Sequence, residues 1–137
     1  MFDILKKFND NGSFIYKSTH RLNEKCNAPT DKIGIYLVYD KDELIYIGRS
    51  GKINDDGSIF TRQGGIKNRL VAGKQFGEPR RNSWANQMNI EGIDELKIYW
   101  YVTYDSNNKS CPEKIERELL ISYKKLHNRR PKWNKQG

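Results

Sequence analysis

Two apolar runs joined by a very short polar linker constrain the fold of this chain more than any other feature. The runs are IGIYLVYD, residues 33–40, and ELIYI, residues 43–47, and only Lys41 and Asp42 separate them. Ile, Val and Tyr are typical strand residues, and a linker of two residues permits only an antiparallel pairing. The sequence therefore predicts a β-hairpin over residues 33–47.

Downstream of the hairpin, the apolar spacing predicts three helices and one further strand. The helices begin, in chain order, near Gly65, at a cap formed by Asn82 or Ser83 after Pro79, and at Pro112. Residues 95–104, ELKIYWYVTY, have the composition of a strand. Because strands and helices do not alternate regularly, the expected fold class is α+β, with a small central antiparallel sheet of about three strands flanked by helices.

The length of 137 residues predicts a single domain, residues 1–137, with a core of its own. Three of its segments have a distinct composition. They are a lead-in over 1–31 that begins as a short helix and continues irregularly, a turn-rich surface loop over 49–65, and a basic C-terminal segment over 119–137.

The location expected from the sequence is the cytoplasm. No apolar run approaches the length of a membrane span, and the early Asp3 without a long apolar stretch argues against a secretory signal. Cys26 and Cys111 lie far apart in the sequence and outside any metal-binding pattern, so they are expected to be free thiols. A disulfide between the two is the alternative.

The net charge of +8 is concentrated in two blocks. Residues 49–81 carry eight basic and three acidic residues, and residues 119–137 carry six basic and no acidic residues, whereas residues 1–48 are balanced. A polyanion such as nucleic acid is the natural partner of such blocks. A solvated basic surface accounts for the charge alone equally well.

Two tyrosines and two arginines are candidates for chemistry. Tyr36 and Tyr46 are expected near each other across the hairpin, although tyrosines of this kind are usually structural. Arg49 directly follows the second strand and Arg69 lies on the short helix. Arginine binds phosphate bidentately and stabilises charge in phosphoryl transfer, but on their own the two are better explained as solvated surface residues.

The last predicted helix carries two candidate carboxylates. Leu119, Leu120 and Tyr123 follow Glu116 at helical spacing, which places Glu116 at the border of the buried face. Glu118 is expected to point to solvent. A carboxylate beside a basic cleft is a good ligand for Mg²⁺ or Mn²⁺, and an ordinary helix glutamate paired with a lysine is the alternative.

Taken in order, these features resemble the GIY-YIG nuclease superfamily. Gly34-Ile35-Tyr36 and Tyr46-Ile47-Gly48 carry the two naming triplets, with nine residues between the tyrosines. Arg49 matches the basic residue that follows the second triplet, and Arg69 the helix arginine. ERELLISY, residues 116–123, resembles the glutamate motif, and PKWN, which ends at Asn134, the closing element. The resemblance spans residues 33–134.

The resemblance implies the GIY-YIG fold and an endonuclease that hydrolyses DNA phosphodiester bonds with one divalent ion, Mg²⁺ or Mn²⁺. Tyr36 would be the general base, with its pKa lowered by neighbouring cations, or would orient the attacking water, and Tyr46 would orient water or phosphate. Arg49 and Arg69 would neutralise the phosphate. Glu116 would bind the metal. Asn134 would support the metal or the phosphate. Outside the family motifs, the loop 49–65, the segment 74–84 with Lys74, Arg80 and Arg81, and the basic C-terminal segment are the expected surfaces for substrate contact.

Double-stranded DNA is the expected partner, and no membrane is expected. A compact member of the family would be weakly specific, structure-specific, a restriction-type homodimer or dependent on a partner. A non-catalytic nucleic-acid-binding module on the same fold and an RNA-directed nuclease are the alternatives.

The sequence departs from the family pattern in three places. Gly73 stands four residues after Arg69, where the family often has histidine or tyrosine, so any proton-transfer role there is vacant unless Lys74 or a tyrosine from elsewhere takes it. The loop between Gly48 and Arg69 is longer than in compact members, and extra residues precede the PKWN element. The preference for Glu116 over Glu118 depends on the helical register of the two leucines and the tyrosine.

Overall fold

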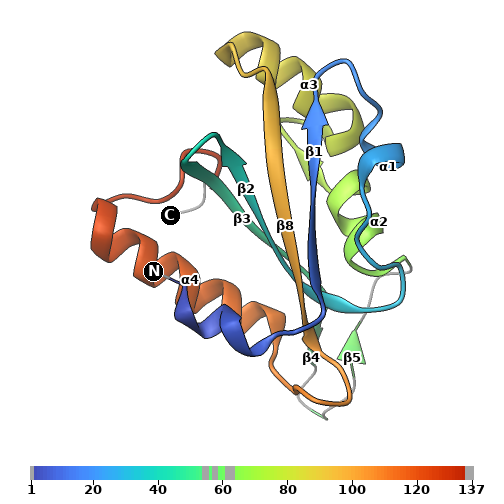
Figure 1. The fold of residues 1–137 in the computed structure, drawn as a ribbon, viewed down its shortest axis with the longest axis vertical. Helices are drawn as coiled ribbons and strands as arrows, with labels where there is room; N and C mark the ends of the chain where they lie inside the picture. The colour runs from blue at the N-terminus through green and yellow to red at the C-terminus, as the bar shows by residue number, and fades with distance from the viewer. Residues whose placement is uncertain (1, 54–55, 57–58, 61–63, 135–137) are drawn as a thin grey trace.

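The computed structural model describes residues 2–53, 56, 59–60 and 64–134, and it is built around a four-stranded antiparallel sheet. The strands lie in the spatial order β1 (Asn11–Lys17), β8 (Glu95–Tyr104), β2 (Ile33–Asp40) and β3 (Glu43–Ser50). Figure 1 shows the sheet in the middle of the molecule, with helices on both of its faces. The α+β class expected from the sequence is therefore confirmed.

Strand β1 is the main departure from the expected fold, because it raises the number of sheet strands from about three to four. The segment over 1–31 was expected to be a helix and an irregular lead-in, but its middle part pairs with β8 along its whole length. Phe14 and Tyr16 are buried, whereas Ile15 between them is 45% exposed. This is the alternation of a half-buried edge strand, over too few residues to stand out among polar neighbours.

The predicted hairpin is confirmed as β2 and β3, and it contains an irregularity that the sequence pattern does not predict. Lys41 adopts a left-handed backbone conformation in the turn, with φ of 55°. The register shifts between Val38 and Tyr39, so that Val38 pairs with Tyr46 while Tyr39 pairs with Leu44. This β-bulge reverses the alternation of β3 and puts Tyr46 on the same face of the sheet as Tyr36.

The remaining elements surround the sheet and include several short ones. The 3₁₀ helix is η1 (Asp3–Lys7), the helices are α1 (Leu22–Lys25), α2 (Gly65–Ala72), α3 (Arg80–Glu91) and α4 (Pro112–His127), and the short strands are β4 (Lys52–Ile53), β5 (Ile59–Phe60), β6 (Lys74–Gln75) and β7 (Glu78–Pro79).

Two expectations about these elements need correction. The segment over 49–65 was expected to lack regular structure, but β4 and β5 pair within it as a small antiparallel ribbon. Its residues 54–55, 57–58 and 61–63 lie outside the described part of the chain. Helix α3 begins directly after Pro79 rather than at Asn82 or Ser83, and no side chain caps it. The N–H of its first residue, Arg80, donates instead to the Gly73 carbonyl, which satisfies one of the donors that a helix start leaves free.

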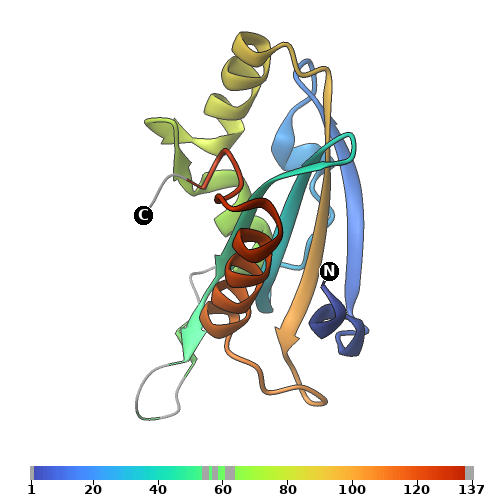
Figure 2. The ribbon, with the colours of Figure 1, turned by 90° about the vertical axis from the view of Figure 1, so that its left-hand side faces the viewer.

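The sheet separates two layers of core packing, as the two views in Figures 1 and 2 agree. Helices α1, α2 and α3 cover one face, where Tyr36, Ile98 and Trp84 belong to the larger apolar cluster. Helix α4 and η1 cover the other face, where Leu37 and Leu119 belong to the second cluster. Strand β2 is buried on both faces over residues 33–38, which explains its uninterrupted apolar sequence.

The cysteines agree with a further expectation. Cys26 and Cys111 are both free thiols. Within the ranges that the structure describes, no helix is long and apolar enough to cross a membrane.

Candidate active site

A cavity of about 470 Å³ opens beside β3, the edge strand of the hairpin, and most of the residues predicted for the site line it. Its volume lies in the range of small-ligand sites. The lining residues come from β3, α2, the β6–β7 hairpin, α3, α4 and the C-terminal segment. They are Tyr46, Arg49, Arg69, Lys74, Gln75, Phe76, Arg80, Glu116, Leu120, Arg130, Trp133 and Asn134.

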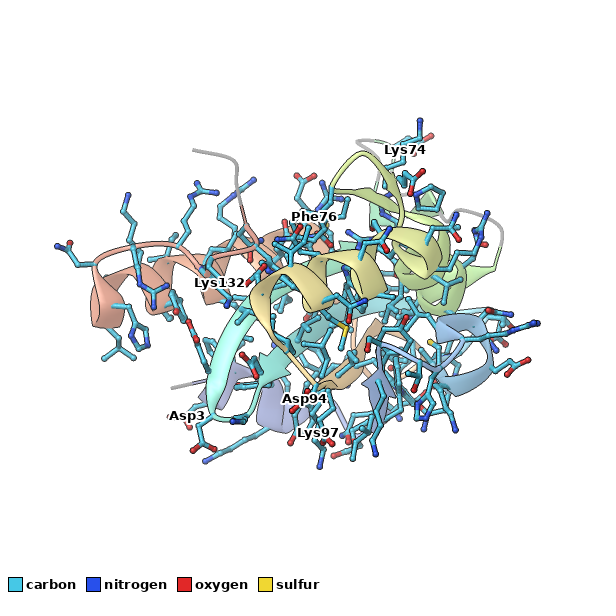
Figure 3. All side chains as sticks on the ribbon, turned by 90° about the horizontal axis from the view of Figure 1, so that it is seen from above. Asp3, Lys74, Phe76, Asp94, Lys97 and Lys132 are labelled. Atoms are coloured by element: carbon cyan, nitrogen blue, oxygen red, sulfur yellow. The ribbon has the colours of Figure 1, made fainter. Side chains whose placement is uncertain are left out.

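The charge of the lining is strongly positive. Among the described residues that line it, five are basic (Arg49, Arg69, Lys74, Arg80 and Arg130) and Glu116 is the only acidic one. Figure 3 shows Lys74 extending outward on the opposite side of the molecule from Asp94 and Lys97. A concave site with this charge concentrates anions.

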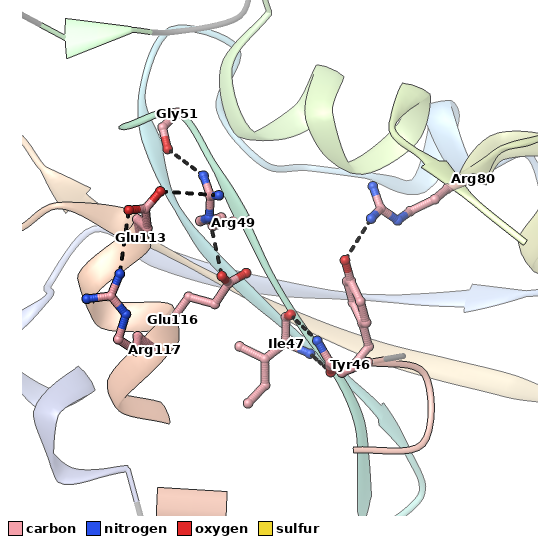
Figure 4. Close-up of polar contacts among 9 residues, drawn as sticks. Tyr46, Ile47, Arg49, Gly51, Arg80, Glu113, Glu116 and Arg117 are labelled. Atoms are coloured by element: carbon pink, nitrogen blue, oxygen red, sulfur yellow. Dashed lines mark hydrogen bonds and ion pairs between the residues drawn. The ribbon is translucent and has the colours of Figure 1, made fainter. Parts of the chain in front are cut away.

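Arg49 joins strand β3 to helix α4. Its Nε lies 3.3 Å from Oε1 of Glu116 and its Nη2 3.4 Å from Oε2 of Glu113, and Figure 4 shows the guanidinium between the two carboxylates. The side chain of Glu116 is 23% exposed and that of Glu113 is 45% exposed. Glu116, the candidate metal ligand, therefore forms an ion pair with Arg49, the candidate phosphate ligand.

The environment of Glu116 makes its carboxylate receptive to a cation. Burial raises the pKa of the Glu116 carboxyl above its ordinary value of 4.5, while Arg49 opposes the shift. Glu118 is only partly buried rather than fully exposed, and it does not line the described part of the cavity wall. The geometry thus favours Glu116 over Glu118 as the carboxylate of the site.

Tyr46 and Arg80 form a second polar contact in the cavity wall. The Nη2 of Arg80 donates to the Tyr46 hydroxyl at 2.9 Å, and the guanidinium carbon lies 5.3 Å from the centre of the Tyr46 ring. Arg80 is 2% exposed, although the sequence suggested only a substrate-contacting surface residue. Figure 4 shows this contact apart from the Arg49 ion pairs.

Tyr36 lies beneath the cavity wall instead of lining it. Its side chain is fully buried, and its ring centre is 6.0 Å from that of Tyr46. Its hydroxyl has no hydrogen-bond partner in the described part of the protein. Burial raises the pKa of the Tyr36 phenol, and the nearby Arg80 and Arg69 only partly offset this. This direction is opposite to the lowered pKa that a general base requires.

The last glycine of the second triplet has a packing role that involves Tyr36. A Cβ at position 48 would lie 2.4 Å from Cζ of Tyr36, closer than real Cβ atoms approach. The backbone register explains this contact, because Tyr36 and Gly48 are directly opposed across the hairpin. The two triplets are therefore complementary in shape, with the ring of one filling the space left by the glycine of the other.

Asn134 closes the cavity by pairing with the edge strand. Its Oδ1 accepts from the Ile47 N–H and its Nδ2 donates to the Ile47 carbonyl, both at 2.9 Å. The Trp133 N–H donates to the Ile45 carbonyl at 2.8 Å. The PKWN element thus caps the otherwise open edge of β3, and both ends of the Asn134 amide are used in doing so.

Several lining residues were not anticipated from the sequence, and Gln75 is the most connected of them. Its Oε1 accepts from Nε of Arg80 and from Nε1 of Trp84, both at 2.9 Å, and its Nε2 donates to the Trp133 carbonyl at 3.3 Å. The other unanticipated residues are Phe76, Leu120, Arg130 and Trp133. The sequence pointed to their segments without giving the residues a role: Gln75 and Phe76 lie in the segment 74–84, Trp133 lies in the PKWN element, and Arg130 lies in the basic C-terminal segment. Arg81, by contrast, is exposed and lies outside the described lining.

Comparisons with family models, with curated proteins and with solved structures found no match. The function is therefore inferred from the residues of the cavity and from the sequence pattern.

The donor set of the cavity fits a divalent ion held by few protein ligands. No group of three or more His, Cys, Asp or Glu side chains occurs among the residues that the structure describes. Glu116 offers one half-buried carboxylate, with Glu113 on the other side of Arg49. Mg²⁺ keeps several waters and is often bound through one or two carboxylates together with substrate phosphates. Glu116 suits this mode of binding.

Proposed function

We propose that this protein is a metal-dependent endonuclease of the GIY-YIG type that hydrolyses phosphodiester bonds of double-stranded DNA. One observation carries the proposal: Tyr46, Arg49, Arg69 and Glu116, which stand far apart in the sequence, line one cavity. Each was singled out by a motif, and the motifs alone do not require the four side chains to meet. Their types are those that phosphodiester hydrolysis requires, namely cations, a hydroxyl and a carboxylate.

Arg69 would neutralise the phosphate that enters the cavity. Its guanidinium has no hydrogen bond or ion pair with the described part of the chain, and its backbone carbonyl is held by Nη1 of Arg80 at 3.0 Å. A guanidinium that these residues leave available, on a fixed helix, is suited to bidentate binding of a phosphate. Arg49 would join it once the phosphate competes with the two glutamates.

Glu116 would hold the divalent ion, Mg²⁺ or Mn²⁺, which when bound would stabilise the charge that develops on the leaving oxygen. Arg49 has a second task in this scheme. By pairing with Glu116 it holds the carboxylate at the cavity wall before the ion arrives, 3.3 Å from its own Nε. When the divalent ion takes the place of Arg49 as the partner of Glu116, Arg49 would be free to bind the phosphate.

The tyrosine that meets the substrate in this proposal is Tyr46. It lines the cavity and its hydroxyl already accepts from Arg80, whereas the Tyr36 hydroxyl is enclosed. Tyr46 would donate to the phosphate or orient the attacking water. Tyr36 would support Tyr46 from below, which revises the role of general base that the family resemblance implied.

A non-catalytic nucleic-acid-binding module is the second candidate, and the Arg49–Glu116 ion pair favours it. If phosphate and metal do not separate this pair, the cavity binds anions without cleaving them. Such a module would bind nucleic acid with strong salt dependence and would cleave nothing.

Cleavage assays on matched substrates test the proposal. The wild-type protein is incubated with duplex DNA, single-stranded DNA and duplex RNA of one sequence, each with Mg²⁺, Mn²⁺ or EDTA. The proposal expects metal-dependent cutting of duplex DNA and none in EDTA. Cutting of RNA alone would assign an RNA-directed nuclease, and salt-sensitive binding without cutting would assign the binding module.

A further inference from the structure

Arg80 is a buried cation whose identified partners are all neutral. Its guanidinium donates to Oε1 of Gln75, to the Arg69 carbonyl and to the Tyr46 hydroxyl, at distances of 2.9 to 3.0 Å. No carboxylate among the described residues forms an ion pair with it. Arginine is rarely buried unless it is paired, because removing a charge from water is costly. No carboxylate among the described residues therefore balances the charge of Arg80 at the wall of the cavity that it lines.

The guanidinium occupies the space that a side chain at position 73 would need. A Cβ added to Gly73 would lie 2.2 Å from Nη1 of Arg80 and 2.5 Å from the Arg69 carbonyl oxygen. The β6–β7 hairpin makes this possible, because it returns the chain so that the Arg80 N–H bonds the Gly73 carbonyl at 3.0 Å. Arg80 therefore stands at the C-terminal end of α2, where the helix dipole favours a cation.

The Arg80 contact also fixes the direction of the Tyr46 hydroxyl. A guanidinium only donates hydrogen bonds, so the hydroxyl oxygen accepts this one and its own proton must point elsewhere. In the described part of the chain no acceptor for that proton is found. The cavity is the open space beside Tyr46, and an anion there would receive a hydrogen bond from the hydroxyl next to the charge of Arg80.

We propose that Arg80 and Tyr46 form a phosphate-binding pair, in which Arg80 is the positioning residue that presents the Tyr46 hydroxyl as a donor to the cavity. The pair fills the place left vacant by Gly73. The identification of the anion as a backbone phosphate rests on the proposed function, and the coupling between the two side chains does not.

Titration of the full chain with inorganic phosphate, without divalent metal, tests this pair. Binding is followed by the NMR signals of the arginine Nε–H groups and the tyrosine rings in the wild type, Tyr46→Phe, Arg80→Met and the double variant. Each single change should weaken phosphate binding by about tenfold, the effect of one hydrogen bond to a charged group. The double variant should be no weaker than Arg80→Met, since Tyr46 acts only when Arg80 directs it. Arg21→Met, an equal loss of charge at an exposed position before helix α1 and outside the described lining of the cavity, should bind like the wild type.

Arg80→Lys keeps the inference testable if Arg80→Met does not fold. Lysine retains the charge but cannot make the same three fixed hydrogen bonds, so Tyr46→Phe should have little further effect when it is combined with Arg80→Lys. Equal losses from Tyr46→Phe in the wild-type protein and in the Arg80→Lys variant would overturn the proposal, as would wild-type affinity in Tyr46→Phe. A protein that binds phosphate through the pair but cuts no nucleic acid would refute only the proposed function, whereas cleavage together with uncoupled binding would refute only the pair.

Discussion

The hydroxyl of Tyr46 accepts a hydrogen bond from Arg80 at 2.9 Å, whereas that of Tyr36, on the same face of the sheet, has no partner among the described residues. The centres of the two rings are 6.0 Å apart, so two tyrosine side chains of one site have different environments. Identical substitutions at the two positions therefore separate a chemical role from a structural one.

Tyr46→Phe is expected to lower the cleavage rate by at least about tenfold, because it removes a hydrogen bond to a charged group. Tyr36→Phe is expected to retain most of the activity and to raise the stability toward urea by about 1 kcal/mol, because it removes a buried hydroxyl that has no partner among the described residues. Single-turnover cleavage and equilibrium unfolding measure the two effects. Loss of activity in Tyr36→Phe with Tyr46→Phe fully active would restore Tyr36 as the general base.

Divalent metal affinity should depend on pH through Glu116. Burial raises the pKa of this carboxyl above 4.5, and a protonated carboxyl does not bind cations. Affinity for Mn²⁺ should therefore be full above the raised pKa and decline as the pH falls through it, with a midpoint above 4.5. Arg49→Met should move the midpoint to higher pH, since Arg49 opposes the shift.

Water relaxation by Mn²⁺ measures this affinity across the pH range. Glu118→Gln is the matched control and should bind Mn²⁺ as the wild type does, whereas Glu116→Gln should not bind it at this site. A midpoint that is unchanged in Glu116→Gln would show that another group holds the ion.

Gly48→Ala should destabilise the protein through Tyr36. The added Cβ would meet the Tyr36 ring at 2.4 Å, and overpacking of this kind costs about 1–3 kcal/mol. In the double variant Gly48→Ala/Tyr36→Leu, the smaller leucine side chain replaces the tyrosine ring and should relieve the clash. The double variant should therefore lose less stability than the sum of the losses in the two single variants. Urea denaturation gives the coupling energy, and strict additivity would show that the contact does not restrict position 48.

Asn134→Ala should open the edge of β3. The change removes both hydrogen bonds to Ile47, each of which contributes about 1 kcal/mol. The Ile47 amide should then exchange with solvent faster in hydrogen-exchange NMR. Asn86→Ala, at an exposed position of α3, is the control. Unchanged protection of the Ile47 amide would mean that the C-terminal segment is held by Trp133 without Asn134.

The elements with strong local patterns were the ones that the sequence predicted well. The hairpin, β8, α2 and α4 appear close to the expected bounds, and the helical spacing correctly placed Glu116 toward the sheet. Strand β1 was missed because its alternation covers few residues. Its partner β8 lies far along the chain, so the pairing depends on tertiary contacts that local propensity does not report.

The sequence predicted which residues form the candidate site better than it predicted how these residues are arranged. Motif positions singled out Tyr46, Arg49, Arg69 and Glu116, and the structure brings these four to one cavity. The arrangement of the two tyrosines on one face depends on the bulge in the hairpin, and the burial of Arg80 depends on the return of the β6–β7 hairpin. Neither feature leaves a periodic trace in the sequence, so the accessible tyrosine and the buried arginine emerge only from the fold.

Nicking of supercoiled plasmid DNA by wild-type protein, Glu116→Gln and Glu118→Gln tests the central claim most directly. With Mg²⁺ or Mn²⁺, the wild type and Glu118→Gln should convert the plasmid to nicked or linear forms, and Glu116→Gln should lose this activity while still binding DNA. Wild-type protein that binds the plasmid but leaves it supercoiled with every divalent ion, or a Glu116→Gln variant that cleaves as fast as the wild type, would contradict the account.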